Sequence, residues 1–283
     1  MSWQLLIALS VLLFSINGLL HRILMKHDAS DAYAQTVAFC GLVCITALII
    51  AVFRGGLHMF FSFNQLLLFV PSVILGALGS ICAFKGFKHI EASEHTILLT
   101  SSRIWFIAGT LLILREAFSW QKLIGGILII IGVSIAQWRK GKFVLNAGAI
   151  YVLLAALFYA GSDLLSFLII RNFDAISYVV YSTAFAVVLL LIIRPSTIQK
   201  LSFYRKPKRL ANIVIVSVND AFASLFAFLA YQTGRNALQI GPLGATQTIV
   251  TVFLALIFLG ETDHMAQKIA GAITVVVGTF ILL

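Results

Sequence analysis

The amino-acid sequence predicts an all-α membrane protein of about ten transmembrane helices, arranged as two inverted five-helix repeats. Three observations support this prediction: the apolar composition, the regular spacing of apolar runs, and an internal repeat. Of the 283 residues, 61% are hydrophobic and only 11% are charged, and the mean hydropathy is +1.04. A soluble domain of this composition would expose too much apolar surface to stay dispersed, so lipid must be the solvent.

The apolar runs have the length of membrane-spanning helices. A span needs about 20 apolar residues, so 283 residues hold roughly ten spans if the loops are short. The first run lacks the basic leader and the cleavage site of a signal peptide, which predicts an uncleaved first helix. No length is left for a soluble catalytic domain of about 100 residues. The predicted spans are 3–23, 32–53, 65–86, 95–114, 120–138, 147–169, 175–194, 211–232, 242–260 and 266–283.

The connections between these spans are short and rich in Gly, Pro and charge. The longest, 194–209, carries six basic residues and is predicted to be a loop. Cys40, Cys44 and Cys82 lie inside apolar runs, which indicates no disulfide framework. Since neither histidine nor carboxylate accompanies them, we expect no metal site, and nothing in the chain indicates a cofactor.

An internal repeat relates the two halves of the chain. Leu114-Arg115-Glu116 corresponds to Leu259-Gly260-Glu261, and Gln121 to Gly125 corresponds to Gln267 to Gly271 at an offset of 146 residues. Gly132 and Gly278 extend the match, and weaker matches lie nearer the start of each half. The repeats are predicted at 1–142 and 147–283. Because five crossings is an odd number, the two copies must enter the bilayer from opposite sides, as in transporters with a central site between rocking halves.

These residues carry a family resemblance. An apolar helix that ends in Leu-x-Glu, a short turn and a glycine-spaced last helix occur twice, and the chain thereby resembles the EamA-like ten-helix members of the drug/metabolite transporter superfamily. The resemblance implies a metabolite exporter or exchanger whose helices 1, 3, 4, 6, 8 and 9 surround a central cavity. The chain departs from the family at Ser102-Arg103-Ile104 and Thr248-Ile249-Val250, where a proline is usual.

Three ionisable residues lie deep inside predicted spans: Arg103, Asp163 and Asp220. Charges at this depth are costly and therefore require an explanation. Each shares a helix face with small or polar residues, so that face is expected to meet protein or water. One interpretation is a structural ion pair of Arg103 with either acid, which leaves the other acid without a basic partner. The alternative is a site in which one acid exchanges protons or binds an amine and Arg103 holds a carboxylate.

One cation site and one anion site together suit a zwitterion such as an amino acid. The predicted substrate site therefore comprises Arg103, Asp163 and Asp220, with Asn17, Tyr159, Trp105 and Gln247 as further candidates. Glu116 and Glu261 are expected to cap or brace the helix that follows each of them, and the repeated glycines to permit close helix packing. His21, His89 and His95 lie near span ends, where solvated side chains are expected.

The sequence favours secondary active transport by alternating access. Because a carboxylate inside a span can exchange protons, protons are among the expected partners. An ion channel and a membrane-embedded enzyme are the alternatives; the chain carries no His-Glu-x-x-His, nucleophile-elbow or phosphate-loop motif, so we expect no enzyme. The net charge of +10 indicates loops that meet anionic headgroups rather than nucleic acid. We expect a multi-pass protein of the bacterial cytoplasmic membrane, with a second copy of the chain as a candidate partner in a homodimer.

The orientation of the termini is open at this stage. Loops after odd-numbered spans carry 14 Lys and Arg residues, and loops after even-numbered spans carry five. Because basic loops stay cytoplasmic, the charges predict both termini outside, whereas the family resemblance implies both inside.

Overall fold

The protein is almost entirely helical. A computed structural model describes residues 2–58, 62–113, 119–139, 142–143, 145–170, 173–234, 243–244 and 246–282. The first half contains α1 (Trp3–Met25), α2 (Ala32–Phe53), α3 (Phe63–His89), α4 (Ala92–Leu99), α5 (Ser102–Ile113) and α6 (Trp120–Gln137). A two-residue hairpin, β1 (Trp138–Arg139) and β2 (Lys142–Phe143), follows. The second half contains α7 (Ala147–Ile170), α8 (Ala175–Ile193), α9 (Thr197–Lys200), η1 (Leu201–Arg205), α10 (Pro207–Gly234), α12 (Gln247–Leu254), η2 (Ala255–Leu259) and α13 (Met265–Leu282).

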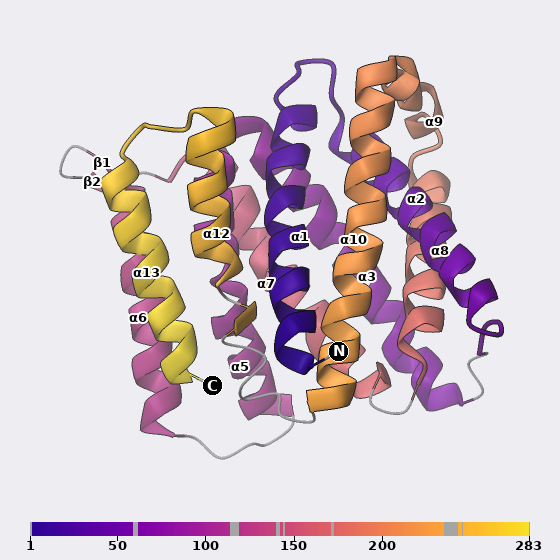
Figure 1. The fold of residues 1–283 in the computed structure, drawn as a ribbon, viewed down its shortest axis with the longest axis horizontal. Coiled ribbons are helices and arrows are strands. Elements are labelled where there is room, and N and C mark those ends of the chain that lie inside the picture. The colour runs from indigo at the N-terminus through magenta and orange to yellow at the C-terminus, as the bar shows by residue number, and fades with distance from the viewer. Residues whose placement is uncertain are drawn as a thin grey trace.

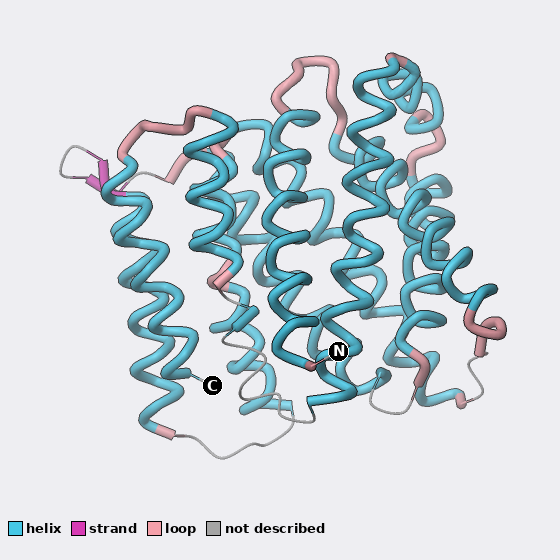
Figure 2. The backbone as a smooth tube through the Cα atoms, in the orientation of Figure 1, coloured by secondary structure: helices cyan, strands magenta, loops and turns pink. Residues whose placement is uncertain are grey.

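Seven of the described helices are long and apolar enough to cross a membrane: α1, α2, α3, α6, α7, α8 and α10. The stretch Gln247–Leu259 and α13 are shorter apolar helices. The predicted fourth span, 95–114, is not one continuous helix, because α4 ends at Leu99 and α5 begins at Ser102. The predicted loop at 194–209 is also wrong in part, since it contains α9 and η1. Figure 2 shows how little of the described chain is loop.

The helices run between two faces of the molecule (Figure 1). Both termini lie toward one face, which we call the terminal face. The β1–β2 hairpin and α9 lie at the opposite face, which we call the hairpin face. The first half starts at the terminal face with α1, whereas α7 starts next to β2, at the hairpin face. The first helices of the two halves therefore enter the layer from opposite sides.

The helices pack in pairs across the two halves. Helix α1 packs along α10 and α3 packs along α7, while α2 packs on α8, α4 on α12 and α6 on α13. Each pair joins one helix of the first half to one of the second half. In Figure 1, α6 and α13 form one edge of the molecule, and α2 and α8 lie toward the other. The buried core is thus shared between the repeats, and polar residues on α1, α3, α7 and α10 face one another.

Close contact between α6 and α13 depends on the repeated glycines. A methyl group on Gly132 would lie 2.8 Å from the carbonyl oxygen of Gly271, and one on Gly278 would lie 2.8 Å from that of Gly125. Real side-chain contacts are not this short, so any larger residue would push the helices apart. The prediction that these glycines permit close helix packing is confirmed for this pair of helices.

Candidate functional site: a polar cluster between the repeats

A break in the fourth span positions Arg103. Around Thr100 and Ser101 the backbone changes to three-residue turns, in which Ser101 N–H donates to Leu98 O (3.1 Å) and Arg103 N–H donates to Thr100 O (3.1 Å). In the second half, α12 starts at Gln247, directly after the turn at Thr246, which is 146 residues beyond Thr100. Interrupted helices at corresponding positions of two repeats are typical of transporter binding sites.

The two interrupted segments contact each other. The hydroxyl groups of Thr100 and Thr248 form a hydrogen bond of 2.9 Å between α4 and α12. Nearby, a methyl group on Gly18 of α1 would lie 3.4 Å from the Thr251 side chain and 3.9 Å from that of Thr96. Helices α1, α4 and α12 therefore meet where the helices are broken.

Asp220 is held by a chain of amides that crosses from one half to the other. Asn17 Nδ2 on α1 donates to Asp220 Oδ1 on α10 at 3.1 Å. Asn219 Nδ2 donates to Asn17 Oδ1 at 2.8 Å and to the backbone carbonyl of Leu13 at 2.9 Å. A carbonyl can only accept, so this bond fixes the orientation of the Asn219 amide and, through it, that of Asn17. Asp220 Oδ1 is thereby used as an acceptor, while no contact within the described chain engages Oδ2.

Tyr159 lies beside both acids. Its hydroxyl donates to Ser80 Oγ on α3 at 3.0 Å, and its ring packs on Gly79, where a methyl group would lie 2.8 Å from a ring carbon. Both Asp163 and Asp220 are close enough for their charges to act on the hydroxyl. The structure thus brings Asn17, Tyr159, Asp163 and Asp220 to one region.

Asp163 is exposed on the inner side of α7. Along this helix the lipid-facing residues Ile150, Leu154 and Leu157 are 47%, 40% and 41% exposed. At about 100° per residue, Asp163 points to the opposite side from these three, together with Tyr159. Its exposure is therefore toward the inside of the bundle rather than toward lipid.

Arg103 and Asp163 interact without direct contact. The Arg103 charge acts on Asp163, and α5 packs on α7. Among the described residues, however, no hydrogen bond or ion pair within 4.0 Å joins Arg103 to Asp163 or to Asp220. The structural ion pair considered from the sequence is thus not formed in this conformation. We call Arg103, Asp163, Asp220, Asn17 and Tyr159 the Arg103 cluster.

Trp105 and Gln247 differ in their position relative to the cluster. Trp105 is 47% exposed and is turned away from Arg103, which lies two residues before it on α5. Gln247 lies at the first turn of α12, where its backbone carbonyl accepts from Ser15 Oγ at 3.3 Å. Its half-buried side chain is close to the meeting point of α1 and α12, whereas Trp105 is not brought to the cluster.

At the hairpin face, Glu261 joins the two halves. Its carboxylate accepts from Ala92 N–H at 2.8 Å, from Ser93 N–H at 3.0 Å and from Ser93 Oγ at 2.6 Å. It thus caps the free N–H groups at the start of α4 and is only 7% exposed. The expectation that Glu261 braces the helix that follows it was wrong, because its partner lies in the other repeat. Glu116 lies outside the described residues.

Further buried polar contacts surround Glu261. Lys268, only 1% exposed, forms an ion pair with Glu91, and Gln137 Nε2 donates to Glu94 Oε1 at 2.8 Å. We call Glu261, Ser93, Lys268 and Glu91 the latch. Each of its charged groups has a partner of the opposite charge or polarity across the two halves.

Two of the three histidines are not solvated. His21 is 7% exposed, its Nδ1 lies 3.0 Å from Gln35 Nε2, and its ring packs against Phe39 and Phe84. His95 is 2% exposed and stacks on Phe87 at 3.6 Å between ring centroids. His89 alone is exposed, as expected. Aromatic neighbours from α2 and α3 cover the other two, so that both serve packing.

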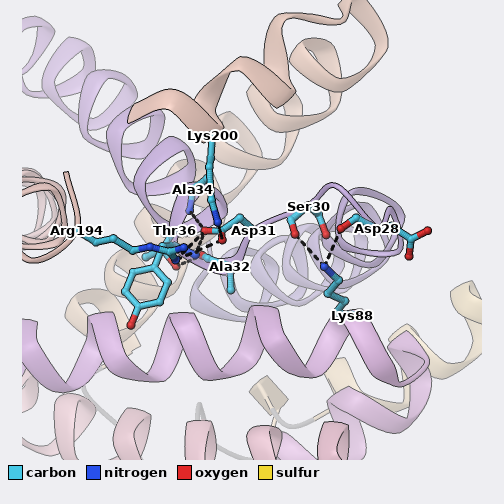
Figure 3. A network of polar contacts seen from close by, with 10 residues as sticks. Asp28, Ser30, Asp31, Ala32, Ala34, Thr36, Lys88, Arg194 and Lys200 are labelled. Atoms are coloured by element: carbon cyan, nitrogen blue, oxygen red, sulfur yellow. Dashed lines mark hydrogen bonds and ion pairs between the residues drawn. The ribbon is translucent and has the colours of Figure 1, made fainter. Parts of the chain in front are cut away.

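Asp31, which directly precedes α2, interacts with two cationic side chains at the hairpin face (Figure 3). Its Oδ2 accepts from Lys200 Nζ at 2.6 Å and pairs with Arg194 at 3.3 Å, while Oδ1 caps the helix through Ala34 N–H at 3.1 Å. Partial burial alone would raise the pKa of Asp31. The Lys200 and Ala34 hydrogen bonds and the charge of Arg194 outweigh burial and lower the pKa below its ordinary value.

The sequence interpretation did not include Asn219, which sets the direction of the amide chain, or Ser80, which holds Tyr159. Asn219 directly precedes Asp220, and two adjacent polar residues in an apolar span are a signal that identifies it. Ser80 carries no such signal, since a single serine is common in membrane helices.

Comparison with protein families identifies the chain. The model of the EamA-like transporter family matches residues 1–137 and again residues 146–283, so the two halves are repeats of one unit. The chain belongs to the EamA-like transporter family. It is therefore an integral multi-pass membrane protein of a transporter family. Comparison with curated proteins gives no match.

A solved structure shares the fold of this EamA-like chain. It is described only as a "crystal structure of protein"; the superposition covers 99% of this chain and 95% of that one, with a TM-score of 0.58 and 12% sequence identity. Similarity at this level of identity concerns the fold alone.

Proposed function

We propose that this EamA-like protein is a secondary active transporter, an exporter or exchanger, for a small polar metabolite with an amine or zwitterionic group, such as an amino acid. The observation that carries the proposal is the pair Arg103 and Asp163, two opposite charges on the packed helices α5 and α7 of different repeats that act on each other without a direct bond. A zwitterion offers a carboxylate to the guanidinium and an ammonium to the aspartate, and thereby neutralises both.

Transport by alternating access agrees with the arrangement of the helices. The two repeats form ten spans in this proposal, seven long helices together with α13 and the interrupted fourth and ninth spans, in two inverted sets of five. The cluster lies between the halves, where a rocking motion would expose it to each side in turn.

Proton coupling is part of the proposal. Asp220 has one oxygen bound by Asn17 and the other open, and acids inside a membrane are the usual proton carriers of such transporters. The proton and the substrate amine would compete for the acids, so that binding of one releases the other. Neither a metal nor a cofactor is required.

The membrane is taken to be the bacterial cytoplasmic membrane, with the basic hairpin face toward the cytoplasm and both termini outside. Alkaline phosphatase fused after Leu283 should then be active and green fluorescent protein dark. The reverse result would place the termini inside.

The experiment that tests the function is a thermal-shift screen of the purified protein against metabolites, followed by exchange in proteoliposomes. A ligand that binds the native state raises the melting temperature with concentration. We expect saturable stabilisation by an amine or a zwitterion, and saturable exchange of that compound. Stabilisation by sugars or purely anionic compounds alone would refute the substrate class, a unitary current would indicate a channel, and a covalent change would indicate an enzyme.

A further inference from the structure

A two-sided segment joins α8 to α10 at the hairpin face. This segment, residues 197–205, comprises α9 and η1, and we call it the elbow (Figure 1). Its inner side is fixed to the bundle: Thr197 is 0% exposed and Tyr204 is 6% exposed, and the Tyr204 hydroxyl donates to Gln35 Oε1. Phe203 packs into the same cluster as Leu24 of α1. The elbow is therefore held rigidly rather than being a free loop.

The outer side of the elbow and its junction with α10 are basic. Arg205, Lys206 and Lys208 are exposed, and none of their side chains has a hydrogen bond or ion pair within the described part of the chain. Arg209 stacks on Phe203 at 4.0 Å from the ring centroid. The cations Arg194 and Lys200 are already paired with Asp31. Between Asp174 and Asp220 the chain contains six basic residues and no acid, so three positive charges remain without a partner.

Apolar side chains are exposed beside these charges. Ile198 on the elbow is 59% exposed, and Ile192 and Ile193 in the last turn of α8 are 72% and 63% exposed. On the other side, Leu210 in the first turn of α10 is 48% exposed. In a membrane-spanning helix such residues meet acyl chains, so the elbow lies where acyl chains give way to headgroups. A short segment with exposed isoleucine and unpaired cations at that depth has the character of an interfacial anchor.

We propose that the elbow and its junction with α10 bind the headgroups of anionic phospholipids. Arg205, Lys206 and Lys208 contact lipid phosphates, and Ile198 inserts among the acyl chains at the headgroup boundary. We favour lipid over an acidic protein because the exposed apolar residues directly flank the cations. A soluble protein bound to the cations would leave these apolar residues facing acyl chains. The adjacent contacts to Gln35 and Asp31 would transmit lipid binding to α2.

The test compares melting of the purified protein with two lipids that differ only in headgroup, dioleoylphosphatidylglycerol and dioleoylphosphatidylcholine. We expect phosphatidylglycerol to raise the melting temperature more, and salt to reduce the difference. The variant R205Q/K206Q/K208Q should lose the difference, whereas the charge-retaining variant R205K/K206R/K208R should keep it. R54Q, at the end of α2 on the terminal face, is the control and should also keep it.

Two results would overturn the proposal. One is a phosphatidylglycerol preference that survives in R205Q/K206Q/K208Q. The other is equal stabilisation of the wild type by polyglutamate in phosphatidylcholine, which would indicate a general surface for polyanions. I198N should weaken the stabilisation without removing the headgroup preference. None of these variants touches the Arg103 cluster, so a failed substrate screen leaves this test unaffected.

Discussion

The latch at the hairpin face and the cluster around Arg103 both join the two repeats through charged side chains, yet they differ in how those charges are satisfied. In the latch, Glu261 accepts three hydrogen bonds and Lys268 pairs with Glu91. In the cluster, Arg103 and Asp163 have no direct polar partner within the described chain. Of the three charged side chains there, Asp220 alone has a hydrogen bond to a described residue, Asn17.

This difference predicts that the latch contributes to the stability of the fold and that the cluster contributes to binding. Breaking a buried, satisfied pair leaves an uncompensated charge and costs several kcal/mol. Removing a charge that has no partner should not destabilise the fold, because an isolated charge inside a membrane is itself unfavourable. The latch should therefore respond to mutation as a structural element, and the cluster as a binding site.

The largest loss of stability is expected for Glu261→Ala. Ala92 N–H, Ser93 N–H and Ser93 Oγ would lose their acceptor at the start of α4, at a cost of about 3–5 kcal/mol. The melting temperature of the purified protein measures this effect. Glu261→Gln keeps one carbonyl acceptor and should lose less, so equal melting of the alanine variant and the wild type would show that the latch is not structural.

A comparison of two cations sharpens the distinction. Lys268→Leu leaves Glu91, 27% exposed, without its partner, and should cost about 2 kcal/mol. Arg103→Leu breaks no ion pair and should leave the melting temperature unchanged or raise it, while transport in proteoliposomes is lost. If both variants melt equally early, the contrast between latch and cluster fails.

A smaller effect is expected for Asn219→Leu. Asn17 loses the partner that fixes its amide, so Asp220 is held less firmly, and stability should fall by roughly 1 kcal/mol. Uptake assays on the same variant should show a weaker affinity for the transported compound. Asn212→Leu is the matched control, since Asn212 joins the same two helices by a bond to Leu20 O at 3.5 Å but does not reach Asn17.

The smallest effect is expected for Asp31→Asn at the hairpin face. Lys200 and Arg194 are 43% and 33% exposed, so solvent screens the interaction, which should contribute about 1 kcal/mol or less. Because the folded pKa of Asp31 is lowered, the contribution is complete above aspartate's ordinary pKa of about 4 and is lost as the pH falls through the folded value. Melting curves of wild type and variant should therefore differ at pH 7 and converge only as the pH falls below the lowered folded pKa.

The sequence predicted the class of fold because lipid imposes strong constraints. Long apolar runs can only be spans, and the repeated glycines Gly125, Gly132, Gly271 and Gly278 predicted close helix packing, although the structure alone shows that α6 and α13 are the helices that meet. The break at Thr100 was not predicted, since neither Thr nor Ser interrupts a helix by itself. Burial of His21 was missed for a related reason: Gln35, Phe39 and Phe84 surround it through tertiary contacts, which no local pattern records.

The site was partly predictable for the same physical reason. Charges inside spans are costly, which singled out Arg103, Asp163 and Asp220 before any contact was known. Which charges are paired depends on the packing of the repeats, and this could not be derived from the sequence. Glu261 illustrates the limit, because its motif was recognised while its partner on α4 lies 168 residues away.

The central claim is that the acids of the cluster are functional rather than structural, and Asp163→Asn and Asp220→Asn test it most directly. Melting temperature and uptake into proteoliposomes should be measured on the same preparations. We expect both variants to melt within the range of the wild type and to lose pH-dependent transport. Aggregation of Asp220→Asn, together with recovery of stability and transport in an Arg103→Leu/Asp220→Leu double variant, would show instead that the charges are structural.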